Sequence, residues 1–257
     1  MSVEDFYQQL TPFYHLIYPD WEASIERQAR ALVEIIEEFW GDRVETILDA
    51  SCGIGTQIFG LAQRGYRLTA SDISAAEVAR ARQEAARRNL TLDLSVADMR
   101  RLYDHHRRQF DLVIACDNAV PHLLTDEDIL AAFQQFYQCT RAGGGCLISV
   151  RDYDKETRTG VQVKPYGLRI QGQTRYLIFQ VWEFFGSIYD LAMYFVEDRG
   201  GSDGVTHIMR TKYYAIGTDK LMQLMTRAGF QQVRRLDGRF FQPVIIGKKD
   251  PKDIKDL

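Results

Sequence analysis

The chain has 257 residues, a hydrophobic fraction of 46% and a formal net charge of -3, so it can bury a large core but has no broad attraction to nucleic acid or anionic membranes. Its four cysteines form no CxxC pair, which indicates neither a disulfide framework nor a zinc site and fits a reducing, cytoplasmic setting. The N-terminus lacks a signal-peptide pattern, and no apolar stretch approaches the roughly 20 residues that span a bilayer, so export and membrane insertion are not expected.

A helix is expected over residues 24–40, because apolar residues recur there at helical spacing on one face. After it, short apolar segments typical of buried strands alternate with amphipathic segments typical of helices. This alternation predicts right-handed crossovers between the parallel strands of one sheet. The expected strands are residues 44–50, 67–71, 92–96, 110–116 and 145–150, and the expected helices between them are residues 55–64, 75–88 and 128–139.

The pattern changes from residue 152 to about residue 215, where Tyr, Phe, Trp, Ile and Val are frequent and turn signals occur at 185–187 and 200–204. Such a segment favours antiparallel hairpins inserted into the parallel domain. The chain then returns to a helix over 218–228 and to strands over 231–236 and 243–247. We therefore divide the chain into N-terminal helices and a ligand-binding core (1–151), an inserted lid region (152–210) and a return to the core (211–257).

Two glycines, Gly53 and Gly55, follow the first expected strand, where the backbone must turn sharply and lie close to a ligand. A dinucleotide site would have a third glycine at position 58, but this chain has Ile58, which argues against a bound diphosphate. Asp72 follows Gly53 by 19 residues and ends the second strand, where it can accept hydrogen bonds from a ribose diol. The loop is therefore expected to bind a nucleoside without a pyrophosphate.

Asp98 and Met99, in the segment VADMR, follow the third expected strand. Because the carboxyl ends of parallel strands meet at one edge of a sheet, these residues are expected at the turn next to Asp72. There Asp98 could accept a hydrogen bond from an adenine amino group, and Met99 could pack on the ring. The two turns together predict a site for an adenosine-like group.

With these motifs the sequence resembles the class I S-adenosylmethionine-dependent methyltransferases. ILDASCGIGTQ is similar to their first motif, ASDIS to the ribose turn, VADMR to the adenine turn and FDLVIACDNAVPHL to the fourth-strand motif. The resemblance covers residues 44–152 and 211–247. It implies S-adenosyl-L-methionine as cofactor, no metal, and an α/β fold: a Rossmann-like, doubly wound, seven-stranded, mostly parallel sheet with an antiparallel last strand and an inserted antiparallel β substrate lid.

Within that class the sequence most resembles the glycine and sarcosine N-methyltransferases. CDNAVPHL is similar to the segment that holds cofactor and amine in that group, VRDYD to its arginine-containing turn after the fifth strand, and KYYAIGTDKLMQLMTRAGF to its late strand and helix. By this resemblance Arg27 approaches the methionine carboxylate of the cofactor and His122 lies near it, while Asp117 stands where that group has a small residue. The expected cofactor-binding residues are Arg27, Asp49, Gly53, Gly55, Asp72, Ile73, Asp98, Met99, Cys116 and His122.

Three of these residues also have a purely structural interpretation. Asp49 either caps the amides of the glycine loop or contacts the ammonium group of the cofactor. Arg27 lies on a helix that could simply expose it, and His122 could be a solvated or hydrogen-bonded histidine at a helix start.

A site for amine methylation must bind the amine with its lone pair directed at the methyl group, while contacts elsewhere hold the rest of the acceptor. Asn118, and with it Asp117, could accept the hydrogens of the amine. The fork of Arg151 suits a carboxylate, although an ion pair with Asp152 or Asp154 is an alternative. Aromatic residues could close the site and exclude water, but most of them are expected to be packing residues. The expected catalytic residues are Asn118, Arg151 and Tyr194, and the expected acceptor-binding residues are Tyr14, Asn118, Arg151 and Tyr176.

These observations predict an S-adenosylmethionine-dependent methyltransferase that acts on a small molecule, with N-methylation of an amine that carries a carboxylate, such as glycine or sarcosine, favoured. O-methylation of a small carboxylate or hydroxyl substrate in the same fold stays open, as does a non-catalytic protein that binds the cofactor. A nucleic-acid partner is disfavoured, because DNAVPH lacks the Pro-Pro-aromatic run that stacks a flipped base. No membrane partner is expected, and a homo-oligomer stays open.

Overall fold

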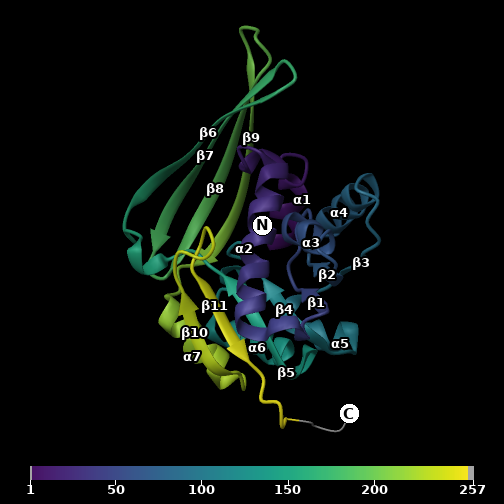
Figure 1. The fold of residues 1–257 in the computed structure, drawn as a ribbon. Helices are drawn as coiled ribbons and strands as arrows, with labels where there is room; N and C mark the ends of the chain where they lie inside the picture. The colour runs from purple at the N-terminus through teal and green to yellow at the C-terminus, as the bar shows by residue number, and fades with distance from the viewer. Residues whose placement is uncertain (1, 254–257) are drawn as a thin grey trace.

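A seven-stranded sheet forms the centre of the computed structural model, which describes residues 2–253 (Figure 1). Its strands are β1 (Thr46–Asp49), β2 (Arg67–Asp72), β3 (Asp93–Val96), β4 (Phe110–Ala115), β5 (Thr140–Ser149), β10 (Gln231–Leu236) and β11 (Val244–Lys248). Their order is β10-β11-β5-β4-β1-β2-β3, and neighbours are parallel except where β11 pairs antiparallel with β5 and β10. The Rossmann-like, mostly parallel sheet with an antiparallel last strand is thus confirmed.

Helices cover both faces of this sheet. One face packs against α2 (Trp21–Trp40), α3 (Thr56–Ala62) and α4 (Ala75–Arg87), and the other against α5 (Leu102–His106), α6 (Asp126–Cys139) and α7 (Thr218–Arg227). Successive strand side chains point to opposite faces, so β1 sends Ile47 into the first layer and Leu48 into the second. Short 3₁₀ turns occur at η1 (Tyr14–Ile17), η2 (Gly41–Arg43), η3 (Met99–Arg101), η4 (Val120–His122) and η5 (Tyr153–Lys155).

A separate antiparallel sheet is inserted between β5 and α7 and extends beyond the core at the top of Figure 1. Its strands are β6 (Val161–Gln171), β7 (Thr174–Phe185), β8 (Ile188–Asp198) and β9 (Gly204–Tyr214), in that order. The helix α1 (Val3–Leu10) packs Phe6 and Leu10 into the same apolar cluster as Tyr189 and Met193 of β8. The inserted sheet and α1 therefore build one layer over the carboxyl edge of the core.

The two faces of the inserted sheet differ in burial. On β7, Ile178, Gln180 and Trp182 are buried. Leu177, which directly precedes Ile178 and points to the other face, is 48% exposed. Because side chains alternate along a strand, Val163 of β6 lies on the same outer face and is 63% exposed. One face of this sheet is therefore buried against the rest of the protein, and the other presents apolar side chains outward.

The core elements predicted from the sequence are confirmed with shifted ends, but α1 and α5 were missed. The missed signal for α1 is a capping box, in which Ser2 Oγ accepts the amide of Asp5 and the Asp5 carboxylate accepts the amide of Ser2. The boundary expected at residue 210 falls inside β9, which continues to Tyr214 in register with β8. Within residues 2–253, no helix combines the length and apolar character needed to cross a membrane.

Candidate functional site

The turn after β1 depends on Gly53 and Gly55, whose φ angles of +53° and +103° are left-handed. A Cβ atom at Gly55 would lie 2.2 Å from the ring of Phe59, and one at Gly53 would lie 3.2 Å from Oε2 of Glu77. Ile58, at the position of a third dinucleotide glycine, is fully buried in the core. The turn is therefore shaped for close approach to a ligand, as its sequence predicts.

The Asp72 carboxylate ties this turn to the end of β2. Its Oδ2 accepts the amide of Gly53 and its Oδ1 accepts the amide of Ser74, both at 2.9 Å. Burial raises the pKa of Asp72, and the amide donors act against that shift. Because a carboxylate oxygen can accept more than one hydrogen bond, Asp72 keeps acceptor capacity for a ribose hydroxyl.

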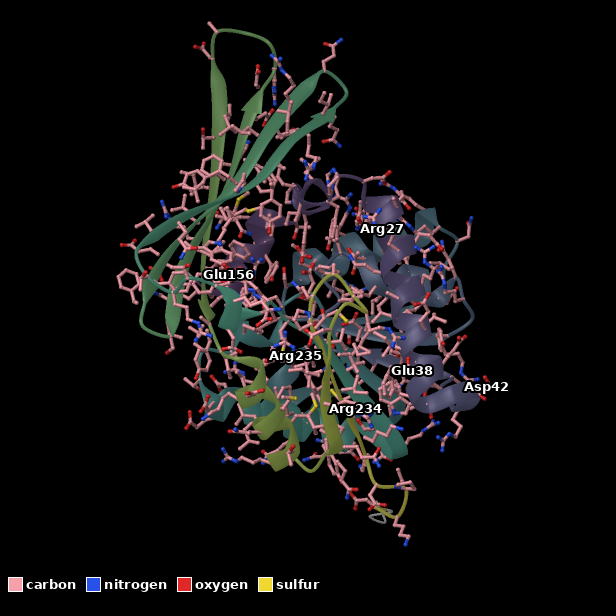
Figure 2. All side chains as sticks on the ribbon, turned by 60° about the vertical axis from the view of Figure 1, so that its left-hand side comes forward. Arg27, Glu38, Asp42, Glu156, Arg234 and Arg235 are labelled. Atoms are coloured by element: carbon pink, nitrogen blue, oxygen red, sulfur yellow. The ribbon has the colours of Figure 1, made fainter. Side chains whose placement is uncertain are left out.

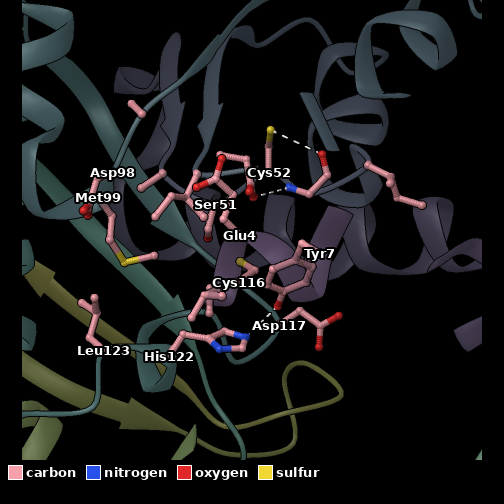
Figure 3. A pocket seen from close by; sticks show the side chains of 18 of the residues that line it. Glu4, Tyr7, Ser51, Cys52, Asp98, Met99, Cys116, Asp117, His122 and Leu123 are labelled. Carbon is pink, nitrogen blue, oxygen red and sulfur yellow. Dashed lines mark hydrogen bonds between the residues drawn. The ribbon is translucent and has the colours of Figure 1, made fainter. Parts of the chain in front are cut away.

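A cavity of about 380 Å³, called here the cofactor cavity, opens at the carboxyl ends of β1 to β4. This volume lies in the usual range for small-molecule sites. Figure 3 shows Asp98 and Met99 at one end of it and Tyr7 toward the other. Seven of the ten expected cofactor residues line it: Gly53, Asp72, Ile73, Asp98, Met99, Cys116 and His122.

Asp98 is already engaged by its neighbour Arg100. Its Oδ1 accepts the Arg100 amide at 2.8 Å, and its Oδ2 lies 2.6 Å from the Arg100 guanidinium. Arg100 also pairs with Asp128 at 3.2 Å. A contact between Asp98 and an adenine amino group would therefore use a lone pair that Arg100 leaves free.

Asp49 is buried behind the glycine turn and does not line the cofactor cavity. Its Oδ1 accepts the amide of Ser51 at 3.0 Å, so the capping interpretation of this residue is supported. Its Oδ2 is buried without a hydrogen-bond partner in the described chain. Burial raises the pKa of Asp49 to about 7.

This raised pKa predicts a pH-dependent stability. The folded form binds the Asp49 proton more tightly than the unfolded form, so the contribution to stability is complete below about pH 4 and is lost as the pH rises through 7. Between about pH 5 and about pH 8 the wild type should lose about 2–3 kcal/mol of unfolding free energy through this group. The loss is about 1.4 kcal/mol per pH unit and runs over the roughly two units from pH 5 up to the folded-state pKa. Urea titrations at both pH values should show that Asp49→Asn lacks this loss.

The exposed Asp42→Asn in η2 serves as the control, because it removes a carboxylate outside the core. It should follow the wild type at both pH values. Equal pH dependence of the wild type and Asp49→Asn would contradict the assignment to Asp49.

The helix α1 covers the cofactor cavity. Ser2, Val3, Glu4 and Tyr7 contribute to the cavity wall, and the Tyr7 hydroxyl lies 2.8 Å from Nε2 of His122. Burial lowers the pKa of His122 to about 3, so its ring is neutral at neutral pH. His122 is thus a hydrogen-bonded histidine that also lines the cavity.

A smaller chamber of about 70 Å³, the acceptor chamber, adjoins the cofactor cavity and shares Tyr7, Tyr14 and Asp117 with it. The core side supplies Asn118 and Arg151 to its wall. The inserted sheet supplies Tyr166, Gln180, Tyr189, Leu191, Met193 and Tyr213. The structure therefore brings together three of the expected acceptor residues, Tyr14, Asn118 and Arg151.

Asn118 connects the turn after β4 with the segment after β5. Its Oδ1 accepts the Arg151 amide at 3.0 Å, and its Nδ2 donates to the Tyr153 hydroxyl at 2.8 Å. Its own amide donates to the carbonyl of Ser149 at 2.9 Å. Both polar atoms of the side chain are engaged, which favours a positioning role over the direct amine contact that the sequence predicted.

Arg151 reaches the acceptor chamber with its guanidinium over the ring of Trp182, 4.5 Å from the ring centroid. The expected alternative partners are engaged elsewhere, Asp152 with Arg235 at 2.5 Å and Asp154 with Arg158 at 2.9 Å. An ion pair of Arg151 with Asp152 or Asp154 was therefore the wrong alternative.

The acid that lies nearest to Arg151 is Glu156, at 3.7 Å, and Glu156 is itself paired with Lys164 at 2.7 Å. The Nε atom of Arg151 is buried without a hydrogen-bond partner in the described chain. The guanidinium therefore keeps donors for a carboxylate.

Arg27 does not line the cofactor cavity, which corrects the prediction that it approaches the cofactor. It lines a wider opening of about 770 Å³, the vestibule, which also includes Asp117, Arg151 and Gln242. Figure 2 shows Arg27 on α2 and Glu156 to the left of it, and both residues line the vestibule. The reason lies in helix geometry: the next residue, Gln28, turns inward to bond Gln57 at 2.8 Å, which leaves Arg27 on the exposed side.

Two aromatic residues of the insertion were assigned wrongly. Tyr194 lies on the outer face of the inserted sheet, stacked on Phe179 at 4.6 Å, so it cannot act in the acceptor chamber. Tyr176 lies on the inner face but packs against Phe13 and lines none of the three cavities. The face of the sheet on which each tyrosine lies depends on how the strands pair and pack, and the residue types alone do not reveal this.

Other residues of the site were missed. Glu77 is fully buried, accepts a hydrogen bond from Thr11 Oγ1 at 2.7 Å and approaches Gly53. The signal for its position is Ser74, whose side chain caps α4 and accepts the Glu77 amide. No comparable signal marks Tyr166, which enters the acceptor chamber from β6.

The described part of the chain contains no candidate metal site. Between residues 2 and 253, no three His, Cys, Asp or Glu side chains gather in a way that could hold a metal ion. The four cysteines are buried and unpaired.

Residues 47–144 match the model of a family described as a methyltransferase domain. The chain is 29% identical over 145 residues to a glycine/sarcosine N-methyltransferase from Parasynechococcus marenigrum, a match that covers 56% of this chain and 50% of the relative. It is 27% identical over 135 residues to a glycine/sarcosine N-methyltransferase from Aphanothece halophytica, which covers 52% and 50%. The chain thus spans about half the length of the curated relatives it matches.

Among solved structures, the fold is similar to that of an S-adenosylmethionine-dependent methyltransferase from Clostridium acetobutylicum. The TM-score is 0.78 at 16% identity, and the match covers 93% of this chain and 98% of the other. Because the structural match extends over nearly the whole chain, it includes the inserted sheet.

Proposed function

We propose that this chain transfers a methyl group from S-adenosylmethionine to the nitrogen of a small amine that carries a carboxylate, such as glycine or sarcosine. The match of residues 47–144 to the model of a methyltransferase domain, and the fold similar to that of an S-adenosylmethionine-dependent methyltransferase, support this proposal. The observation that carries the proposal is an acceptor chamber that adjoins the cofactor cavity and contains both Asp117 and Arg151. The similarity of the chain to two glycine/sarcosine N-methyltransferases supports the same acceptor class.

The residues of the cofactor cavity fit S-adenosylmethionine. Asp72 would accept from the ribose hydroxyls, Met99 and Leu123 line the end expected for the adenine, and the glycine turn leaves room for close approach. When bound, this cofactor supplies an activated methyl group on a positively charged sulfur.

The chain's own residues bind and orient the acceptor. Arg151 would hold the carboxylate through two parallel N–H···O bonds, with the guanidinium kept in place by Trp182. Tyr7, Tyr14 and Asp117 at the junction of the two cavities would border the nitrogen. Positioning of this kind can supply much of the rate acceleration.

A radiolabelled transfer assay tests the proposal. The protein is incubated with methyl-labelled S-adenosylmethionine and a panel of amino acids, simple amines, hydroxy acids and carboxylic acids. We expect label in N-methyl products of amino acids, and the outer-face variant Tyr194→Phe should match the wild type. Label in hydroxy acids or carboxylic acids alone would indicate an O-methyltransferase, and cofactor binding without transfer to any panel member would contradict catalysis on small acceptors.

A further inference from the structure

Asp117 occupies a singular place in the site. Of residues 2–253, it alone lines the cofactor cavity, the acceptor chamber and the vestibule together. Its half-buried carboxylate therefore lies where an acceptor entering by the vestibule would meet the cofactor.

The carboxylate of Asp117 has only neutral hydrogen-bond donors. The Tyr18 hydroxyl donates to Oδ2 at 3.0 Å, and Nε2 of Gln242 donates to Oδ1 at 3.3 Å. No lysine or arginine among the described residues forms an ion pair with it, and the nearby Arg151 has Glu156 as its nearest acid. Each oxygen thus retains acceptor capacity, and Arg151 stabilises the negative charge only from beyond ion-pair distance.

The backbone holds this carboxylate in an uncommon conformation. Asp117 and Asn118 have φ angles of +56° and +65°, a left-handed pair that costs energy in residues other than glycine. The Asp117 amide donates to Ser149 Oγ at 2.8 Å, and the Asn118 contacts to the segment after β5 fix the same turn. Such local strain is typical of functional sites, and here it directs an acid to the cavity junction.

We propose that Asp117 binds the reacting nitrogen of the acceptor through N–H···O hydrogen bonds and thereby selects amino acids over the corresponding hydroxy acids. A primary amine such as that of glycine offers two hydrogens while its lone pair stays free, enough to serve both Asp117 oxygens, whereas a hydroxyl offers one. With Arg151 at the carboxylate, the small chamber fits a compact molecule that carries both groups. This inference rests on the proposed function and names the feature that its acceptor must have.

The test is the variant Asp117→Asn. Asparagine has nearly the same size as aspartate and also tolerates a left-handed backbone conformation. The amino acid with the highest turnover in the panel, or glycine if none turns over, is titrated by calorimetry together with its hydroxy-acid counterpart, with S-adenosylmethionine affinity measured alongside. We expect the amino acid to bind about 10- to 100-fold more weakly, the hydroxy acid and the cofactor to change within about twofold, and the exposed Asp237→Asn to behave as wild type.

The outcomes separate this inference from the proposed function. A variant that binds the amino acid as tightly as the wild type overturns the role of Asp117, as does an equal loss for amino acid and hydroxy acid. A wild type that binds the amino acid but transfers no methyl group contradicts the proposed function, while the titration still decides the role of Asp117. A wild type that binds no amino acid overturns both.

Discussion

Asp72→Asn is expected to weaken S-adenosylmethionine binding by about 1.5–3 kcal/mol, or roughly 10- to 100-fold in Kd. The Asp72 carboxylate accepts the amides of Gly53 and Ser74 on its two oxygens. An asparagine must turn its NH₂ group toward one of these amides, so the glycine turn loses one hydrogen bond while the ribose loses a charged acceptor. Calorimetric titration with S-adenosylmethionine measures the change.

Asp93→Asn is the matched control, since Asp93 is 63% exposed at the start of β3 and pairs with Arg108 away from the cavity. It should leave the cofactor affinity unchanged. Unaltered affinity in Asp72→Asn would refute the ribose assignment, and tighter binding of NAD than of S-adenosylmethionine by the wild type would count against the cofactor itself.

Arg151→Lys should raise the Michaelis constant for a carboxylate-bearing acceptor about 10- to 100-fold, with cofactor affinity nearly intact. Lysine keeps the charge but loses the planar fork that lies over Trp182 and its two parallel donors. A carboxylate-free analogue of the acceptor should be equally poor for both proteins, because the contact that distinguishes them is missing. Steady-state kinetics on both acceptors gives the comparison.

Arg158→Lys controls for a general effect of arginine replacement, because Arg158 pairs with Asp154 outside the acceptor chamber. A melting curve accompanies each variant. Loss of stability in Arg151→Lys without selectivity between the two acceptors would assign Arg151 a structural role, and wild-type kinetics would end its assignment to the carboxylate.

The core of the fold could be predicted because its signals are local. Helical spacing and short apolar runs marked the elements of the sheet, and the glycines, Asp72 and Asp98 follow strand ends that meet at one edge. The inserted sheet was predicted as antiparallel hairpins, and its four strands do pair in chain order, but which face of each strand points to the core was not predicted. Tyr194 shows the result: its residue type fitted a site, but its strand position places it on the other face.

The site could be predicted where backbone geometry demands a residue type, as at Gly53 or Asp72. The site could not be predicted where the contacts of a side chain depend on which neighbouring residues the fold brings close to it. Two residues are examples, because their orientation depends on neighbouring side chains and elements. Arg27 lies on the exposed side of α2, and Asn118 is hydrogen-bonded to the chain at both of its side-chain polar atoms. Arg151 lies just after β5 and lines the acceptor chamber, and its acidic neighbour is Glu156 rather than Asp152 or Asp154.

The alternation along β7 and β8 makes the acceptor chamber depend on turns that lie outside it. Gln180 pairs with Met193, and both face the chamber, whereas Phe179 and Tyr194 one residue earlier and later face outward. A slip of β8 by one residue against β7 would turn Met193 outward and Tyr194 toward the chamber. The two-residue turn between Phe185 and Ile188, where Gly186 has a φ of +68°, sets this pairing, so the length of this turn decides which β8 side chains line the acceptor chamber.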